Sequence, residues 1–364
     1  MAIFTDVFED VTKQGRKIPT SDYHETGVYP IIDQGQSAIA GYTDETDGLF
    51  TDVPAIIFGD HTRVLKYVDT PCFLGADGVK LLKAKIANPN YKYLYYVLSN
   101  ANIPNTGYNR HFKWLKEVDI PFPDAEEQQK VVDTLDKISE LITLRKDQLA
   151  KLDQLVKSRF IELFGNILCD NNLPLVELKE LADIGSSKRI YANEYVEFGV
   201  PFYRSKEIRE LGTGLKPSVE LFIKQERYEE IKAKYGVPKI GDILIAAIGA
   251  TIGYSWIVDT DKPFYYKDGN LIILSIKNNV NPIFLNHTMG ILIEDFKSKG
   301  VAGSAQLALT IEKLEKMMVI NPSIDLQNQF AAFVEQTDKS KLAIQQSLDK
   351  LEFLKKSLMQ EYFG

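Results

Sequence analysis

An internal repeat constrains the fold of this chain more than any other feature. Residues 115–165 align without a gap with residues 314–364. The two segments are identical at 12 of 51 positions, against about three expected for unrelated sequences of average composition. Self-similarity over this length indicates a duplicated structural unit. Since 364 residues are also too many for one ordinary domain, we expect two related halves.

Each copy of the repeat predicts a long helix with an apolar seam. Apolar residues recur at alternating steps of three and four, the spacing of helices that pack on each other. Pro123-Asp124 with Glu127 predicts the start of the first helix, Pro322-Ser323 predicts the start of the second, and a glycine ends each. Each helix would span about 40 residues, or roughly 60 Å. The seam residues predicted to face a partner helix are Leu135, Ile138, Ile142, Leu149, Leu152 and Val156 in the first helix, and Val334, Ile344, Leu348 and Leu351 in the second.

Two arrangements of these helices remain open. Each could bury its apolar stripe on its own domain, as isolated amphipathic helices usually do. Matching seams in one chain instead favour pairing of the two helices, and a whole domain between them allows an antiparallel coiled coil around an approximate twofold axis.

The segments between the helices repeat as well. Residues 51–70 align with residues 241–260, Asp77-Gly78 matches Asp268-Gly269, and residues 16–18 match residues 188–190. The offsets imply about 18 extra residues in the second copy, within residues 198–235. We therefore predict a domain over residues 1–123, a helix over 124–165, a second domain over 166–322 and a second helix over 323–364.

The fold class predicted for both domains is α+β. Short β-rich runs such as 243–248, 254–258 and 271–276 are separated by turn pairs such as Gly-Asp and Asp-Gly. This pattern is typical of a mostly antiparallel sheet with peripheral helices. The whole chain is then two similar β-rich domains separated by two long helices.

Composition and charge narrow the function classes. The chain has two cysteines, neither in a Cys-x-x-Cys pair nor near a histidine at ligand spacing, so we expect no disulfide framework and no metal site. No apolar run approaches the roughly 20 residues that cross a bilayer, and acidic residues lie where a secretory signal would be basic and apolar. We therefore expect a cytoplasmic protein that does not associate with membranes.

The net charge of −7 argues against strong nucleic-acid binding by the chain alone. Residues 1–124 carry −4 and residues 166–322 carry −1, so neither domain is basic overall. We expect DNA binding by this chain to be weak and salt-sensitive unless a more basic partner supplies phosphate contacts.

No constellation of catalytic residues stands out. Asn88-Pro89 and Asn281-Pro282 resemble part of the motif with which amino-methyltransferases grip adenine, but both lack its second proline. Asparagine as helix N-cap and proline as first helical residue explain both sites. The turn at 249–253 is no Walker A loop, because no Gly-Lys-Ser/Thr follows it. A self-contained methyltransferase or nuclease is therefore the less favoured alternative.

Basic and polar residues recur at equivalent places in both domains, with different neighbours. In the major groove Asp and Gln suit cytosine or adenine, whereas Arg and Lys suit guanine. A duplicated fold whose two copies carry different residues at these places could therefore read two different short DNA sequences. The candidate contacts are Arg16, Lys17, Gln34, His61 and Arg63 in the first domain, and Lys188, Arg189, Tyr203, Arg204 and Lys206 in the second.

Several further motifs occur in order along the chain, some of them twice. They are the Pro-Asp or Pro-Ser step with a nearby glutamine (Gln128, Gln327), helices that end in Phe-Gly, the run 241–253 and Gly303-Ser304-Ala305-Gln306. With these motifs the chain resembles, over its whole length, the specificity subunit of type I restriction-modification enzymes.

The resemblance implies a non-catalytic subunit with two target recognition domains. Each domain would read one half of a bipartite double-stranded DNA sequence, and the antiparallel helices would set the distance between the halves. The helices would also dock two modification subunits that carry S-adenosylmethionine. The complex can recruit restriction and translocase subunits that use ATP and Mg²⁺, so this chain itself needs no cofactor. The competing hypothesis is a coiled-coil scaffold without a DNA-reading role.

The resemblance adds three candidate DNA contacts. Thr251 lies in the small-residue loop 249–253 and Gln306 in the Gly-Ser-Ala-Gln motif of the second domain. The first domain departs from this pattern, because residues 59–63 lack the small-residue loop. There Asn109-Arg110-His111 stands where the second domain has residues 305–307, which makes Arg110 a candidate.

Overall fold

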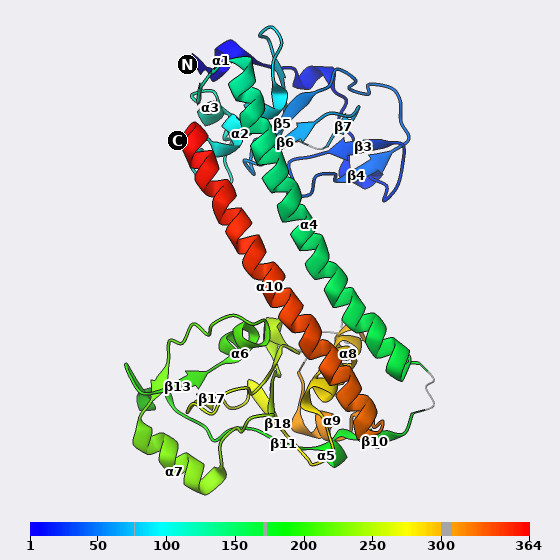
Figure 1. The fold of residues 1–364 in the computed structure, drawn as a ribbon, viewed down its shortest axis with the longest axis vertical. Coiled ribbons are helices and arrows are strands. Elements are labelled where there is room, and N and C mark those ends of the chain that lie inside the picture. Colours follow the sequence, from blue (N-terminus) through cyan, green and yellow to red (C-terminus); the bar gives the residue numbers. More distant parts are fainter. Residues whose placement is uncertain (76, 170–172, 300–307) are drawn as a thin grey trace. The chain divides into compact units, whose positions relative to one another are not determined.

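The computed structural model describes residues 1–75, 77–169, 173–299 and 308–364. The chain divides into two compact units. The first unit comprises Met1–Gln148 and Ile344–Gly364, and the second comprises Leu149–Ala343. Each unit combines an α+β domain with one half of each long helix (Figure 1).

The described residues of the first unit form three small sheets. The largest has the strand order β2-β8-β5-β6 and is antiparallel throughout. The second has the order β4-β3-β7, in which β3 and β7 are parallel, and β1 pairs with β9. The elements are β1 (Ala2–Ile3), α1 (Phe4–Val7), β2 (Phe8–Asp10), η1 (Thr12–Gln14), η2 (Thr20–Asp22), β3 (Tyr29–Ile32), β4 (Gly41–Thr43), β5 (Ala55–Gly59), β6 (Leu65–Val68), β7 (Phe73–Leu74), β8 (Val79–Ala84), α2 (Tyr91–Asn100), α3 (Phe112–Leu115) and β9 (Asp119–Ile120).

The second unit repeats this topology. Its described residues form an antiparallel sheet β11-β18-β15-β16, a sheet β12-β14-β13-β17 with β13 and β17 parallel, and the pair β10-β19. The elements are β10 (Leu175–Glu177), α5 (Leu178–Leu181), β11 (Ala182–Gly185), η3 (Ala192–Glu194), β12 (Tyr195–Val196), β13 (Val200–Tyr203), α6 (Ser205–Gly212), β14 (Phe222–Ile223), α7 (Gln225–Tyr235), β15 (Ile243–Ala246), η4 (Gly249–Thr251), β16 (Ser255–Ile257), β17 (Tyr265–Tyr266), β18 (Leu271–Ile276), α8 (Pro282–Lys299), α9 (Ile311–Glu315) and β19 (Met318–Ile320).

The shared strand order confirms the predicted pair of similar α+β domains. Helices α6 and α7 lie within residues 198–235, where the sequence offsets predicted the extra residues. Central strands β5 and β15 are buried along their whole length, which explains why both are continuous apolar runs instead of alternating ones.

The two long helices form as the repeat predicted. Helix α4 spans Ala125–Phe164 and α10 spans Ile324–Phe363. Both begin in the same way: the Gln128 Nε2 donates to the Pro123 carbonyl at 2.9 Å, and the Gln327 Nε2 donates to the Pro322 carbonyl at 2.9 Å. These glutamines, identical in the repeat, tie the first turn of each helix to the last residues of the preceding domain.

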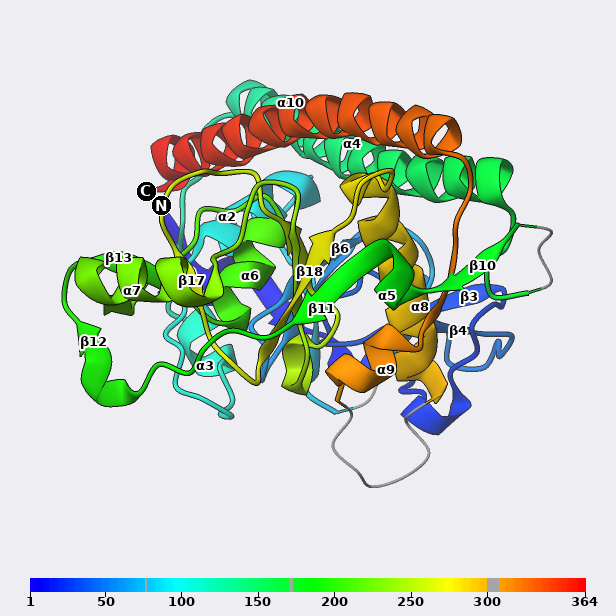
Figure 2. The ribbon, with the colours of Figure 1, turned by 90° about the horizontal axis from the view of Figure 1, so that it is seen from below.

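Within each unit the segments of α4 and α10 that belong to it lie side by side and run antiparallel (Figures 1 and 2). In the second unit Asp153 pairs with Lys341 at 2.6 Å, and Phe160 packs on Phe330 with ring centroids 5.3 Å apart. As residue numbers increase along α4, the residue numbers of its contacts on α10 decrease, as they do in an antiparallel pair. Each predicted seam residue is buried or half-buried: Leu135, Ile138, Ile142, Leu149, Leu152, Val156, Val334, Ile344, Leu348 and Leu351.

One predicted helix cap was placed two residues too early. Asn281 caps α8 as expected: its Oδ1 accepts from the Ile283 N–H at 2.9 Å, and Pro282 is the first helical residue. In the first unit the cap is Asn90, whose side chain accepts from the Tyr93 N–H. Asn88 is in a left-handed conformation before the helix.

The ungapped alignment of residues 51–70 with 241–260 is wrong at the central strand. Gly59 ends β5 and Ala246 ends β15. The Gly59 N–H donates to Val64 and the Ala246 N–H donates to Tyr254 across the following loop, so this loop is three residues longer in the second unit. Gly249 therefore belongs to the longer loop and is not the counterpart of Gly59.

Within the described ranges, no helix is both long enough and apolar enough to cross a bilayer.

Candidate nucleic-acid interface

The duplicated basic residues form equivalent ion pairs in the two units. Lys17 pairs with Asp77 at 3.0 Å in the first unit, and the Arg189 Nε donates to Asp268 at 2.7 Å in the second. Each acid follows the parallel strand β7 or β17. Lys17, and to a smaller extent Arg110, lowers the pKa of Asp77, while the hydrogen bond to Asp268 raises the pKa of Arg189. The same scaffold position thus holds a cation in both domains.

In the first unit the structure gathers several predicted residues around Asp77. The Gln34 Nε2 donates to the Asp77 carbonyl at 3.1 Å, and the Gln34 Oε1 accepts from the His61 N–H at 3.3 Å. The His61 Nδ1 lies 3.2 Å from the Asn109 carbonyl, and the His61 ring stacks on Tyr108. We call Lys17, Gln34, Asp77, His61, Tyr108, Asn109 and Arg110 the Asp77 cluster.

Two glycines allow this close packing. A Cβ on Gly78, whose φ is +93°, would lie 2.8 Å from the Gln34 amide and 2.8 Å from the His61 ring. A Cβ on Gly59 would lie 2.8 Å from the Gln34 Cβ. Since real Cβ atoms do not approach this closely, any side chain at either position would displace Gln34 or His61.

Asp60 anchors the loop that carries Tyr108 and Asn109. This residue is buried, and its carboxylate accepts from the Phe112 N–H at 2.7 Å. Its carbonyl oxygen accepts from the N–H of His111 at 2.8 Å and lies 2.9 Å from that residue's Nδ1. Because Asp60 directly precedes His61, the end of β5 and the loop are fixed relative to each other.

Two other predicted cations of the first unit have separate partners. The Arg16 guanidinium pairs with Glu45 at 3.1 Å and lies near Asp47. The Arg63 Nη1 donates to the Ile103 carbonyl at 3.2 Å, and the Arg63 backbone is left-handed, with φ of +62°. Of the predicted residues in this unit, Lys17, Gln34, His61 and Arg110 therefore come together, whereas Arg16 and Arg63 do not join them.

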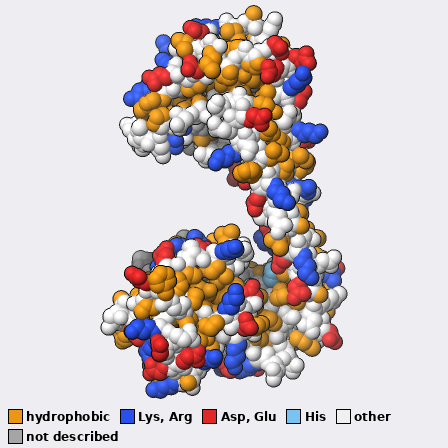
Figure 3. All heavy atoms as spheres, turned by 60° about the vertical axis from the view of Figure 1, so that its left-hand side comes forward, with side chains coloured by type: hydrophobic (Ala, Val, Ile, Leu, Met, Phe, Trp, Pro, Cys, Tyr) orange, Lys and Arg blue, Asp and Glu red, His pale blue; other side chains and the backbone are white. Residues whose placement is uncertain are grey.

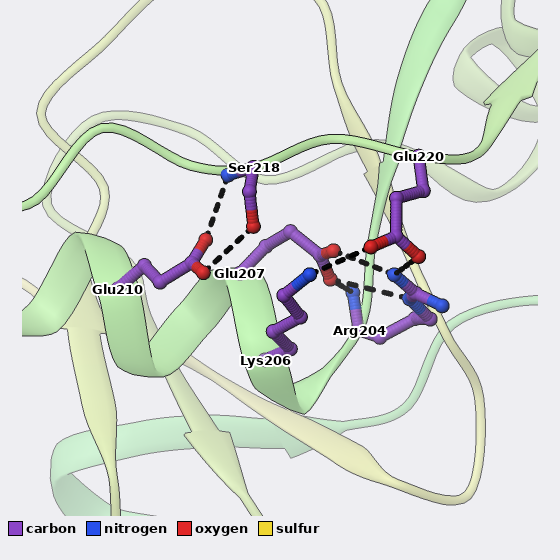
Figure 4. Close-up of polar contacts among 6 residues, drawn as sticks. All are labelled: Arg204, Lys206, Glu207, Glu210, Ser218 and Glu220. Atoms are coloured by element: carbon purple, nitrogen blue, oxygen red, sulfur yellow. Dashed lines mark hydrogen bonds and ion pairs between the residues drawn. The ribbon is translucent and has the colours of Figure 1, made fainter. Parts of the chain in front are cut away.

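In the second unit Arg204 and Lys206 belong to an ion-pair network at the start of α6 (Figure 4). The Arg204 Nη2 lies 2.8 Å from Glu207 and 2.9 Å from Glu220. The Lys206 Nζ lies 2.7 Å from Glu220. The Glu207 side chain is 0% exposed, so Arg204 compensates a fully buried carboxylate.

The ion pairs of this network shift the pKa values of Glu220 and Arg204. Hydrogen bonds from Lys206 and Arg204 lower the pKa of the exposed Glu220 carboxyl to about 2. The hydrogen bond to Glu207 is the largest cause that raises the pKa of Arg204. In the free protein Glu220 therefore occupies the two cations that the sequence singled out as DNA contacts.

The equivalent strand end of the first unit carries a pair of opposite polarity. The parallel pairings of β3 with β7 and of β13 with β17 make Asp33 the counterpart of Arg204, each directly after its strand. Asp33 accepts from the Lys66 Nζ at 3.3 Å, and Lys66 is 8% exposed.

The remaining candidates of the second unit lie in different surroundings. Tyr203 is 8% exposed and packs on Phe264 with ring centroids 4.9 Å apart, so it belongs to the hydrophobic core and we remove it from the contact set. The preceding residue, Phe202, is buried as well, so both residues at the end of β13 belong to this core. The Lys188 Nζ lies over the Tyr235 ring at 5.2 Å, Thr251 ends the η4 turn, and Gln306 lies outside the described residues.

Sequence reasoning missed Tyr108, Asn109, Glu207 and Glu220. A large aromatic within the Asn- and Gly-rich loop 105–109 was a usable signal for Tyr108, because binding residues are often found on loops. No sequence signal identified Glu207, since its burial depends on tertiary packing. On the face shown in Figure 3, Lys and Arg side chains are interspersed with Asp and Glu, in keeping with the acidic composition.

Comparison with known proteins identifies the chain's relatives. The family model described as the type I restriction modification DNA specificity domain matches residues 4–154 and 172–352. The chain belongs to this family. It is a specificity subunit with two specificity domains, the non-catalytic member of a restriction-modification system.

Individual relatives agree with this assignment. A Haemophilus influenzae protein named as a type I restriction enzyme specificity subunit is 27% identical over 290 residues, which cover 74% of this chain and 72% of the relative. The EcoR124I/EcoR124II specificity subunit of Escherichia coli is 31% identical over 137 residues, 34% of each protein.

Two solved structures share the fold of this specificity subunit. The S subunit of a type I restriction-modification system from M. genitalium superposes with a TM-score of 0.64 at 18% identity, covering 100% of this chain and 95% of the other. A chain from a study of complex assembly and conformational transition of the type I system gives 0.54 at 16% identity, covering 99% and 95%.

Proposed function

We propose that this specificity subunit reads a bipartite double-stranded DNA target, with each domain contacting one half. The observation that carries the proposal is the pair of equivalent ion pairs, Lys17–Asp77 and Arg189–Asp268, on one duplicated scaffold with different neighbours. Equivalent cations suit contacts to the phosphate backbone, which position a reader without specifying sequence. The residues that differ around them suit base recognition.

The proposal extends to partners. The paired helices dock two modification subunits, which bind S-adenosylmethionine, and the complex can recruit restriction and translocase subunits that use ATP and Mg²⁺. This chain holds none of these cofactors, and the complex acts in the cytoplasm. The family description and the complex-assembly neighbour support such partners. Partner subunits would also supply the cationic surface that a chain of net charge −7 lacks.

Mapping of methylated adenines in cells with and without this gene tests the proposal. We expect a split motif of two short defined parts around an undefined gap, present only when the gene and its modification partner are expressed. Replacing residues 1–123 by the first domain of a related subunit should change one part of the motif and leave the other. A scaffold without a reading role would instead bind partners through its helices while the motif stayed the same in every variant.

The proposed spacing role of the helices has a separate test. Removing residues 143–149 together with the equivalent residues 342–348 deletes seven residues, or about 10 Å, from each helix. The gap in the methylated motif should shorten by about three base pairs, since one DNA turn spans about 34 Å, with both defined parts unchanged. Removing residues 143–149 alone misaligns the antiparallel seam and serves as the control for simple loss of the complex. An unchanged gap in an active double deletion contradicts the spacing role.

A further inference from the structure

The hydrogen bonding of His61 fixes which ring nitrogen carries its proton. The His61 Nδ1 lies 3.2 Å from the backbone carbonyl of Asn109. A carbonyl oxygen can only accept, so Nδ1 is the protonated nitrogen of the neutral ring. The other nitrogen, Nε2, then carries a lone pair and acts as an acceptor. Nε2 makes no hydrogen bond to any described residue and is not among the buried polar atoms.

Tyr108 holds the plane of the His61 ring. The two ring centroids are 4.7 Å apart and the planes are inclined by 8°. Tyr108 is 87% exposed, so this stack projects from the surface instead of filling the core. An exposed tyrosine ring kept flat against a histidine is a rigid platform, because tyrosine loses little conformational freedom when it is fixed.

Gln34, in contrast, already uses both ends of its amide within the cluster. Its Nε2 donates to the Asp77 carbonyl and its Oε1 accepts from the His61 N–H. Gly59 and Gly78 lie directly against the Gln34 side chain, so close packing keeps this amide in place. Gln34 is therefore a positioning residue that holds the backbone of His61 in place.

We propose that His61 is the base-reading residue of the first domain and that Nε2 accepts a hydrogen bond from the exocyclic amino group of an adenine or a cytosine in the major groove. These are the two bases that present an amino donor there. Lys17 and Arg110, at the margin of the same cluster, contact phosphates. The inference rests on the proposed function and names the recognised chemistry for one position of the first half-site.

Two substitutions at His61 separate its nitrogens. In His61→Asn the amide reproduces Nδ1, keeps the donor to the Asn109 carbonyl and lacks Nε2. In His61→Gln the longer side chain places an amide near the position of Nε2. We expect His61→Asn to lower discrimination at one position of the first half-site by about tenfold, the effect of one specific base contact, and His61→Gln to retain part of it. His24→Ala, an exposed histidine of the same domain, is the matched control.

Modified DNA tests the amino group directly and distinguishes the two bases. The full chain with its modification subunits is bound to targets in which one adenine of the first half-site is replaced by purine, or one cytosine by pyrimidin-2-one, each lacking the exocyclic amino group. The wild-type complex should lose about tenfold in affinity at one such position, and the His61→Asn complex should not distinguish the modified base from the normal one there.

Each result has a defined meaning. Unchanged discrimination by His61→Asn at every position, with normal folding by circular dichroism, overturns the role of His61 and leaves the bipartite reading intact. Loss of discrimination at positions of both half-sites, or an equal loss in His24→Ala, also overturns it. If the wild-type complex shows no split motif, the proposed function itself fails.

Discussion

The two domains place an ion pair at the same strand end with opposite signs. After β3, the acid Asp33 meets Lys66, and after β13, the cation Arg204 meets the buried Glu207. In each pair the second residue, supplied by the neighbouring β6 or α6, is the more buried one. The duplicated scaffold therefore preserves the position of a charge at the surface while the sign of that charge differs between the domains, as the proposed reading of two different sequences requires.

The domains also differ where they pack on the long helices. Asn90 and Asn281 cap equivalent helices, which makes Tyr96 and His287 counterparts. The Tyr96 hydroxyl donates to Asp136 on α4 at 2.6 Å in the first unit. His287 packs edge-on against Phe330 of α10 in the second. A phenol stays neutral near pH 7 and an imidazole titrates there, so one attachment should depend on pH and the other should not.

The largest loss of stability is expected when Arg204 or Asp33, at the two equivalent strand ends, is replaced by alanine. Arg204→Ala leaves the fully buried Glu207 carboxylate without its partner and should cost about 3–5 kcal/mol of stability. Asp33→Ala leaves Lys66, whose long stem can carry the ammonium to water, and should cost about 1–3 kcal/mol. Urea unfolding followed by circular dichroism measures both.

A double variant checks the cause of this difference. Arg204→Met with Glu207→Leu removes both charges and should recover most of the stability, because an apolar pair of similar size replaces a buried ion pair at little cost. Equal losses for Arg204→Ala and Asp33→Ala would show that burial of the remaining partner is not the deciding factor.

The stability of the second unit should depend on pH through His287. Burial lowers the pKa of His287 below its ordinary value of 6.5. Since the unfolded chain binds this proton more readily, the stabilisation is complete above pH 6.5 and falls as the pH drops below it. Unfolding of the second unit measured from pH 7.5 to 5 should show this loss, and His287→Phe should remove it. A pH profile that is the same in His287→Phe and in the wild type would assign the dependence to other groups.

The acids Glu220 and Asp77, which hold candidate cations, should limit DNA affinity to different extents. Glu220→Gln releases Lys206 and removes one of the two acids that hold Arg204, which stays paired with Glu207, and Asp77→Asn releases Lys17. Because Glu220 holds two cations and Asp77 chiefly one, we expect binding to the second half-site to tighten severalfold at low salt and binding to the first to tighten less. Fluorescence anisotropy with half-site variants measures the change. Weaker binding by Glu220→Gln would make this network structural only.

The smallest effect on DNA binding is expected when the cation of either equivalent pair, Lys17–Asp77 or Arg189–Asp268, is removed. Lys17→Ala and Arg189→Ala should each reduce the slope of log affinity against log salt by about one, with little change in sequence preference, as for a lost phosphate contact. A change in preference at one base position would instead make the residue a base reader.

The sequence predicted the parts of the fold that the repeat records directly. Gln128 and Gln327 are identical because they make the same hydrogen bond at the same helix start. Seam residues such as Leu149 and Leu348 are identical because both helices need the same stripe. These contacts are local or follow a regular period, so residue identity alone indicates them.

Features that depend on distant packing could not be predicted in this way. Arg204 was interpreted as an exposed contact, since nothing in the sequence shows that Glu207, three residues later, is fully buried or that α6 packs on β15 and β16. Tyr203 was predicted to be a DNA contact because nothing in the sequence shows that Phe202 and Tyr203, two consecutive residues at the end of β13, are both buried. Gly249 was aligned with Gly59 because a three-residue insertion is invisible in a short ungapped match.

That longer loop in the second domain has an evolutionary consequence. The strands on either side of it, β15 and β16, keep the same pairing pattern as β5 and β6 despite the added residues. Natural variation can therefore lengthen or shorten this connection without disturbing the sheet beneath it. For the proposed DNA-reading role, this means that target preference can change through insertions and deletions as well as through point substitutions, while the core stays intact.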